Sequence, residues 1–313
     1  MYMSYTLDFE KFINPLEAQM QQMKSEVGSN SSMLKEVESL GDQIEKMLSN
    51  LYENLDPWQK VQVARHPDRP TGKHYVQKLI KDFVPISGDR AISDDPAIVC
   101  GLGVFEGNPV AVIAHNKGLN LEERLETNFG MAHPQAYRKV IRVFELANRF
   151  NLPILSFVDT KGAAANKNSE EGGQSFALAD CISASFCLEV PFISVIVGEG
   201  GSGGAIALAS GHSLLMLTNS VFSVASPDAC ASILWKDRAF SGQAAKALKV
   251  TSSELIKLGI IDKEIKEPVG GAHRFPEKTY EMVKKALEKE LQALSKLSHV
   301  QLKELQQNRV GKF

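Results

Sequence analysis

The stretch PFISVIVGEGGSGGAIALA, residues 191–209, decides the fold class that the sequence predicts. It begins with a Val/Ile-rich run, passes through the glycine-rich segment 198–204 and ends in small residues. The same order of strand, loop and helix occurs once before, in PILSFVD (153–159), the loop 160–174 and SFALADCISASFCL (175–188). Helices that alternate with buried apolar strands are typical of α/β proteins. We therefore expect an α/β fold that contains a repeated unit.

Two neighbouring segments extend this pattern toward the N-terminus. The segment 97–118 carries two Val/Ile-rich runs around Glu-Gly-Asn-Pro at 106–109, which predicts a β-hairpin. The segment 134–150 places apolar residues on one helical face and arginine and lysine on the other. No long linker interrupts the chain after the proline-bounded turn ARHPDRP (64–70), so residues 60–275 are expected to form one core domain.

The two ends of the chain have helical periodicity. Apolar residues at helical spacing between residues 8 and 55 predict a pair of helices, with a turn at GSNSS (28–32), and we assign residues 1–59 to an N-terminal helical arm. So short a hairpin buries little by itself, so it is expected to pack on a partner or on the main domain. Residues 276–313 are expected to form an amphipathic helix (276–294) and a tail.

Composition excludes several classes of partner. The 35 basic and 37 acidic residues nearly balance, and no dense Lys/Arg cluster occurs, so neither nucleic acid nor an anionic membrane is an expected partner. The four cysteines form no C-x-x-C pair and the seven histidines lack ligand spacing, so no metal is expected in this chain. The N-terminus lacks the features of a signal peptide, and no apolar run approaches the roughly 18 residues of a membrane span. We expect a cytoplasmic protein.

The glycine run fits two motifs that depend on side chains or cofactors. Gly198, Gly200 and Gly203 satisfy the dinucleotide fingerprint G-x-G-x-x-G, but no acidic residue follows Gly203 until Asp228, which disfavours a ribose-binding site. The G-x-S-x-G motif of serine hydrolases is satisfied at Ser202. Asp228 or Asp262 followed by His273 then completes the chain order of a catalytic triad. Glycines on both sides would leave this serine poorly held.

A third interpretation needs no side chain. Glycines permit close approach of the backbone to a substrate, and a helix that begins near Gly203 and Gly204 directs free N–H groups and a partial positive charge at it. Each well-placed donor of this kind stabilises a developing oxyanion by roughly 3 kcal/mol. Ser202 is then a spacer rather than a nucleophile.

A series of motifs resembles the carboxyltransferase alpha subunit of the multisubunit, bacterial-type acetyl-CoA carboxylase. The resemblance covers nearly the whole chain and implies a crotonase-like (ClpP/crotonase) core of repeated ββα units. Its motifs are ARHPDRP (64–70), GDR (88–90), NFGMAHPQAYRK (128–139), GEGGSGG (198–204), SPDACASILWK (226–236) and EPVGGAHR (267–274).

The resemblance also implies a reaction and its partners. A carboxyl group moves from carboxybiotin to acetyl-CoA, which gives malonyl-CoA for fatty acid biosynthesis. The biotin belongs to a separate biotin carboxyl carrier protein, which a biotin carboxylase charges. A beta subunit of similar fold supplies a zinc ribbon and the acetyl-CoA site, and an alpha2-beta2 heterotetramer is implied. The lack of a metal motif here is consistent with this division.

By motif, the resemblance places the oxyanion hole for biotin at the amides of Gly203 and Gly204. Gly200 and Gly201 shape the approach, and Gly162 and Ala163 line the neighbouring loop. No side-chain base is required, because the biotin nitrogen takes the proton of acetyl-CoA.

One loop departs from the family. The family usually has D-T-P-G-A followed by an aromatic residue, proline and glycine, whereas this chain has DTKGAAAN (159–166). Loss of a proline and of an aromatic residue predicts a looser loop. Lys161 then either lies in solvent or places a cation near carboxylate or phosphate groups. An alternative function follows, a catalytically weak scaffold that binds the beta subunit without holding biotin.

Several charged or aromatic residues have simpler expected roles. Four arginines have two candidate roles, binding of phosphate or carboxylate groups and structural ion pairs with Asp68, Asp89 or Asp94, and we favour the ion pairs. Glu170 and Glu171 are expected to cap the helix that follows them. The arginines are Arg65, Arg69, Arg90 and Arg138. Trp235 and Lys236 are expected to end a helix that is available to a partner subunit.

Overall fold

The computed structural model describes residues 5–26 and 31–310. The predicted turn at 28–32 lies mostly outside these residues, and only its last two serines are described, both in the second helix of the arm. None of the described helices is both long and apolar enough to cross a bilayer.

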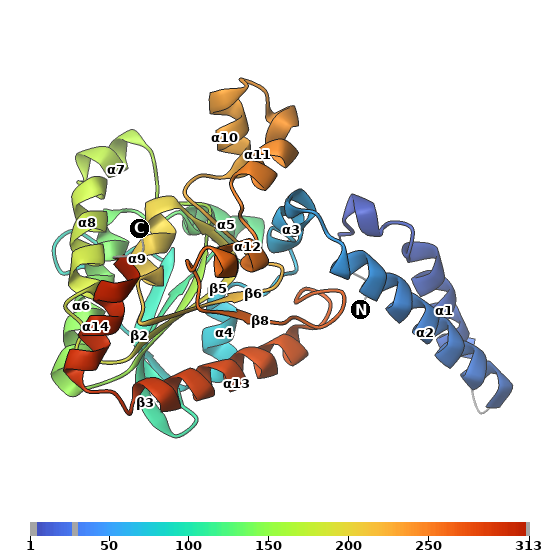
Figure 1. Ribbon diagram of the computed structural model, residues 1–313, viewed down its shortest axis with the longest axis horizontal. Helices are drawn as coiled ribbons and strands as arrows, with labels where there is room; N and C mark the ends of the chain where they lie inside the picture. The colour runs from blue at the N-terminus through green and yellow to red at the C-terminus, as the bar shows by residue number, and fades with distance from the viewer. Residues whose placement is uncertain (1–4, 27–30, 311–313) are drawn as a thin grey trace.

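The described residues form one eight-stranded mixed sheet, in the order β1-β2-β3-β4-β5-β6-β8, with β7 paired to the end of β5 (Figure 1). Strands β1 to β3 are antiparallel, and each of the later pairs is parallel. The strands are β1 (Lys81–Pro85), β2 (Ile98–Phe105), β3 (Asn108–His115), β4 (Ile154–Thr160), β5 (Phe192–Gly201), β6 (Ser213–Leu217), β7 (Val221–Ser223) and β8 (Lys263–Ile265).

The predicted hairpin and the predicted buried strands are confirmed. Strands β2 and β3 pair in continuous register around a turn at Glu106 and Gly107, both with positive φ. Strands β4 and β5 alternate between two cores: Ile154 of β4 packs on one face of the sheet and Leu155 on the other. Burial on both faces explains why these strands are continuous apolar runs.

Helices cover both faces of the sheet. Helices α6, α8 and α9 pack on one face, whereas α4 and α13 pack on the other (Figure 1). The helices are α1 (Asn14–Glu26), α2 (Ser31–Glu53), α3 (Pro57–Ala64), α4 (Gly72–Leu79), α5 (Leu121–Glu126), α6 (Pro134–Phe150), α7 (Lys167–Glu171), α8 (Gln174–Ser185), α9 (Ser202–Ala209), α10 (Pro227–Leu234), α11 (Ser241–Ala247), α12 (Ser252–Lys257), α13 (Pro276–Leu294) and α14 (His299–Val310).

The arm helices α1 and α2 extend away from the sheet and bury a small apolar cluster of their own (Figure 1). Buried polar contacts hold the base of the arm against the main domain. Arg274 Nε pairs with Glu10 Oε1 at 3.3 Å, and Arg274 Nη1 pairs with Glu17 Oε1 at 2.6 Å. Helix α3 runs across the expected boundary between residues 59 and 60, and the division into three parts stays a prediction.

Two helical segments differ from the sequence prediction. The tail beyond 294 forms the further helix α14, and the Gln306 amide donates to the Ser185 carbonyl at 2.9 Å. The prediction that Glu170 and Glu171 cap the following helix is wrong. Both lie in α7, whose C-cap is Gly172. The N-cap of α8 is Gly173, which has no side chain to cap the helix and whose positive φ of 79° turns the chain between the two helices.

Candidate functional site

The glycine run is part strand and part helix. Strand β5 continues through Gly201, because β7 pairs with its last three residues, and helix α9 begins at Ser202. Ser202 itself has a left-handed backbone, with φ at 53°, which turns the chain from the strand into the helix. The segment is thus a tight strand-to-helix turn rather than a loop.

Two of the glycines are required by close packing against the loop that follows β4. A Cβ atom on Gly201 would lie 2.1 Å from the Lys161 carbonyl oxygen. A Cβ atom on Gly204 would lie 2.5 Å from the Ala163 nitrogen and 2.7 Å from the Gly162 carbonyl carbon. All three distances are far below van der Waals contact, so any side chain at either position displaces this loop.

The predicted donors lie at the start of a helix, in different surroundings. The amides of Gly203 and Gly204 are in the first turn of α9, where a helix leaves its N–H groups without a partner of its own, and no side chain caps this end. Gly203 is half-buried, and a Cβ atom there would meet only Leu178 Cδ1, at 3.6 Å. Gly204 is buried beneath the 162–163 loop and close to the unpaired Tyr137 hydroxyl.

The loop at Gly162 and Ala163 has specific anchors. The Gly162 amide donates to Thr160 Oγ1 at 3.1 Å, and the Thr160 hydroxyl donates to the Gly130 carbonyl at 2.7 Å. The buried Ala164 donates its amide to the Ala132 carbonyl at 3.0 Å. These hydrogen bonds offset the loss of proline that led us to expect a looser loop.

The hydrolase triad is not assembled among the described residues. The His273 ring is buried beside the arm, where it stacks on His66 with ring centres 4.1 Å apart. The Asp262 carboxylate accepts the Leu214 amide, and that of Asp228 accepts from Arg65. These contacts hold the three residues in separate parts of the fold, so the motif at Ser202 is not joined by the base that a nucleophilic serine needs.

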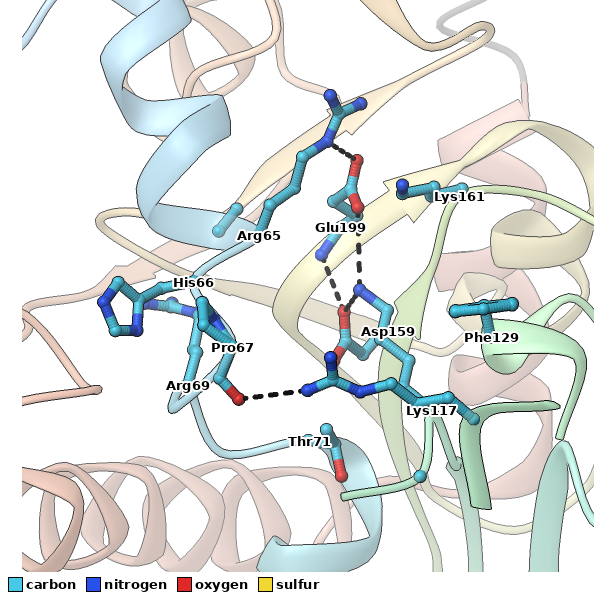
Figure 2. Close-up of a pocket in the computed structure, with 13 residues that line it drawn as sticks. Arg65, His66, Pro67, Arg69, Thr71, Lys117, Phe129, Asp159, Lys161 and Glu199 are labelled. Atoms are coloured by element: carbon cyan, nitrogen blue, oxygen red, sulfur yellow. Dashed lines mark hydrogen bonds and ion pairs between the residues drawn. The ribbon is translucent and has the colours of Figure 1, made fainter. Parts of the chain in front are cut away.

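A cavity of about 150 Å³ opens at the ends of β3, β4 and β5 (Figure 2). The residues predicted from the glycine motif do not line it, although Lys161 and Glu199 lie directly before Gly162 and Gly200 in the sequence. Its charged and aromatic lining comprises Arg65, His66, Arg69, Lys117, Arg124, Phe129, Asp159, Lys161 and Glu199.

A buried charge network joins the ends of the three strands. Lys117 Nζ lies 2.5 Å from Asp159 Oδ1 and 3.6 Å from Glu199 Oε2. The Glu199 amide also donates to Asp159 Oδ1 at 3.0 Å. Burial is the largest influence on Lys117 and acts to lower its pKa, but the two carboxylates outweigh it and raise the pKa of this ammonium. The lysine therefore stays charged.

Arginines complete the network. Arg65 Nε donates to Glu199 Oε1 at 2.8 Å, and Arg65 Nη1 donates to Asp228 Oδ2 at 2.7 Å. Burial acts to raise the pKa of Glu199, yet Lys117 and Arg65 lower it overall, so this carboxyl is ionised. Arg69 forms a buried two-point pair with Glu267, at 2.7 and 3.0 Å.

Three of the four arginines are structural, as predicted, but two of them have unexpected partners. Arg65 and Arg69 do not pair with Asp68; they bind carboxylates from distant strands and loops. Arg138 pairs with the predicted Asp89, at 3.0 Å. The exposed Arg90 forms no ion pair among the residues that the structure describes.

Sequence reasoning missed Lys117, Asp159 and Glu199 as one group. They are far apart along the chain, but Asp159 and Glu199 each lie toward the carboxyl end of a buried strand. That shared position was the available signal, because parallel strands bring their carboxyl ends to the same edge of a sheet. No group of metal-ligating side chains occurs in the described part of the chain.

The fold defines the class of protein. The structure is similar to transcarboxylase 12S, with a TM-score of 0.58 and 16% identity over 72% of this chain and 40% of that one. It is also similar to the Pseudomonas malonate decarboxylase MdcD-MdcE hetero-dimer, with a TM-score of 0.55 and 19% identity over 64% of this chain and 82% of that one. The predicted crotonase-like carboxyltransferase fold is thereby confirmed.

Sequence comparison gives the family. The model of the acetyl co-enzyme A carboxylase carboxyltransferase-like family matches residues 6–313. Acetyl-coenzyme A carboxylase carboxyl transferase subunit alpha of Acidiphilium cryptum is 47% identical over 95% of this chain and 93% of its own length. That of Desulfitobacterium hafniense is 44% identical over 99% and 98%. The chain belongs to the family of acetyl-CoA carboxylase carboxyltransferase alpha subunits, and its function is that of this subunit.

Proposed function

We propose that the first turn of α9 is the oxyanion site at which this subunit holds carboxybiotin during carboxyl transfer to acetyl-CoA. Carboxybiotin supplies the carboxyl group. The amides of Gly203 and Gly204 donate to the oxygen of its urea and neutralise the negative charge there. The product is malonyl-CoA, the precursor for fatty acid biosynthesis.

One observation carries this proposal: both amides lie in the first turn of α9, where a helix leaves its N–H groups without a partner of its own and where no side chain caps the end. An amide pair in such a position favours a negatively charged oxygen. The Gly201 and Gly204 contacts with the 161–163 backbone add a rigid wall beside the pair. The residues present therefore suit an anionic oxygen without any charged side chain at the turn.

The remaining parts of the reaction belong to other chains. A beta subunit with a zinc ribbon supplies the acetyl-CoA site, and a carrier protein brings the biotin that a biotin carboxylase has charged. An alpha2-beta2 assembly is proposed. Exposed apolar side chains before α10 and at its end support docking of the beta subunit: those of Val224, Ile233, Leu234 and Trp235 are 73%, 74%, 65% and 40% exposed.

The test is reconstitution. The chain is mixed with its beta subunit, free biotin and malonyl-CoA, and acetyl-CoA formation is followed. We expect turnover only when both subunits are present. The Ser202→Ala variant is expected to keep this turnover, because the serine side chain is a spacer. Loss of turnover in that variant, with folding unchanged, would instead support nucleophilic chemistry at Ser202.

A scaffold role is the second candidate, and the altered loop at 161–166 is the observation that favours it. A scaffold forms the complex with the beta subunit, as judged by size-exclusion chromatography, without producing acetyl-CoA. Restoring proline in a Lys161→Pro variant would then increase turnover from this low level. Complex formation together with turnover in the unmodified chain excludes the scaffold role.

A further inference from the structure

Lys161 is an unpaired cation at the mouth of the cavity. Its side chain is exposed, and it forms no ion pair or side-chain hydrogen bond with any residue that the structure describes. Figure 2 shows its amino group directed toward the carboxylate of Glu199. Its charge is close enough to favour the ionised forms of Glu199 and Asp228. The ammonium is thus free to bind an anion beside the glycine turn.

Glu199 presents an unsatisfied acceptor to the same cavity. Its side chain is 6% exposed, and its Oε1 atom accepts from Arg65. Its Oε2 atom is buried and accepts no hydrogen bond from the described residues. The nearest cation, Lys117 Nζ, is 3.6 Å from Oε2 and is closer to Asp159. A buried carboxylate oxygen without a donor is unfavourable, so an N–H or O–H group of a ligand would stabilise it.

We propose that Lys161 and Glu199 form a two-part subsite for a small ligand that carries both an anionic carboxyl oxygen and a separate hydrogen-bond donor. Lys161 Nζ binds the anionic oxygen, and Glu199 Oε2 accepts the hydrogen of the donor. A carboxylated urea has this chemistry, with the carboxylate on one nitrogen and N–H on the other. Hydrogencarbonate has it as well, with O–H and anionic oxygens on one carbon.

This inference rests on the proposed function for the choice of carboxylated urea, and it assigns a role to a residue at which the chain departs from its family. Proline at position 161 has no charge to offer, so the subsite distinguishes this chain from relatives with D-T-P-G-A. The lysine replaces a conformational restraint with an electrostatic contact to the group that is transferred.

Stable probes separate the two halves of the subsite. We would titrate the complex of this chain with its beta subunit, by calorimetry, with 2-oxoimidazolidine-1-acetate, which carries a ureido N–H and a carboxylate. Acetate tests the anionic half alone, and 2-imidazolidone tests the donor half alone. Hydrogencarbonate, titrated separately, distinguishes a free one-carbon anion from a carboxylated urea as the ligand.

The variants are matched to these probes. Lys161→Met is expected to weaken binding of the ureido acetate and of acetate about fivefold, as for loss of one solvent-exposed ion pair, and to leave 2-imidazolidone unaffected. Lys167→Met is the control, because Lys167 begins helix α7 shortly after this loop, is 84% exposed and, among the described residues, pairs with Glu171.

Glu199→Gln tests the other half. Because Oε1 accepts from Arg65, the amide oxygen of the variant stays at that position and the NH2 group replaces Oε2. A donor then faces the donor of the ligand, so 2-imidazolidone binding is expected to be lost. Thermal denaturation of this variant shows whether the charge network still folds. If it does not, Lys161→Met, at an exposed position, tests the subsite by itself.

The outcomes separate this inference from the proposed function. Unchanged binding of the ureido acetate to Lys161→Met, or no binding to the unmodified complex, overturns the subsite even if the complex forms acetyl-CoA. Probe binding that depends on Lys161, in a complex without turnover, overturns the proposed function and keeps the subsite. Binding of hydrogencarbonate but not of the ureido acetate identifies the free anion as the ligand.

Discussion

Replacing Gly204 with alanine tests the packing on which the site depends. The added methyl group would lie 2.5 Å from the Ala163 nitrogen and 2.7 Å from the Gly162 carbonyl carbon, whereas unstrained contacts are about 3.5–4.0 Å. The 162–163 backbone must therefore move by about 1 Å. Overpacking of this kind costs about 1–3 kcal/mol. For a chain of this size we expect the melting temperature to fall by roughly 5 °C.

Gly203→Ala is the matched control, one residue away in the same helical turn. Its methyl group would meet only Leu178 Cδ1, at the ordinary distance of 3.6 Å. Alanine is favoured over glycine in a helix by up to about 1 kcal/mol, so we expect an equal or slightly higher melting temperature. The Gly203 amide also remains in place, so turnover with the beta subunit is expected to persist.

The assay is thermal denaturation of both variants by circular dichroism, followed by turnover of each complex well below its melting temperature. Gly204→Ala is expected to lose stability and turnover together, because the loop beside the amides is displaced. Equal melting temperatures for the two variants would refute the packing argument. Full stability of Gly203→Ala with complete loss of turnover would show that the site needs open space at 203 rather than an amide.

Three further predictions concern buried polar groups. Tyr137→Phe removes a hydroxyl that has no partner among the described residues, so we expect chemical denaturation to show stability unchanged or raised by about 1 kcal/mol; a clear loss would reveal a missing partner. Arg69→Met leaves Glu267 ionised and buried and is expected to cost about 3–5 kcal/mol in the same assay, and a loss below about 1 kcal/mol would contradict this. Burial, and then His273, lowers the pKa of His66 from 6.5 to about 4, so the unfolded chain binds a proton at a higher pH than the folded chain does. Stability is therefore expected to fall by up to about 3 kcal/mol as the pH decreases from 6.5 to 4, and His66→Gln is expected to flatten this dependence; equal slopes would argue against it.

Periodicity predicted most of the fold because both faces of the sheet are buried. Strands β4 and β5 are apolar runs for that reason, and the helix predicted at 134–150 has the observed bounds of α6. The short helix α7 escaped prediction, since its five residues are mostly polar and exposed. Helix α14 was missed because only isolated residues, such as Leu302, are buried.

The site was predicted in part, for a physical reason. Several glycines seldom occur together in a sequence without a structural cause such as a tight turn, so the turn at 200–204 could be identified. The close approach of Gly204 to the 162–163 loop depends on pairing between β4 and β5, which no local pattern encodes. The Lys117–Asp159–Glu199 network likewise forms only when three strands end at one edge.

The central claim is that backbone amides, and no reactive side chain, stabilise the negative charge on the urea oxygen of biotin. The most direct measurement replaces the Gly204 amide with an ester by semisynthesis, which substitutes oxygen for N–H and adds no side chain. Turnover of the intact complex with the beta subunit is then compared with that of the all-amide protein. Loss of one such donor is expected to lower kcat about 10²- to 10³-fold, with complex formation unchanged. An ester variant that turns over as fast as the all-amide protein would contradict the account.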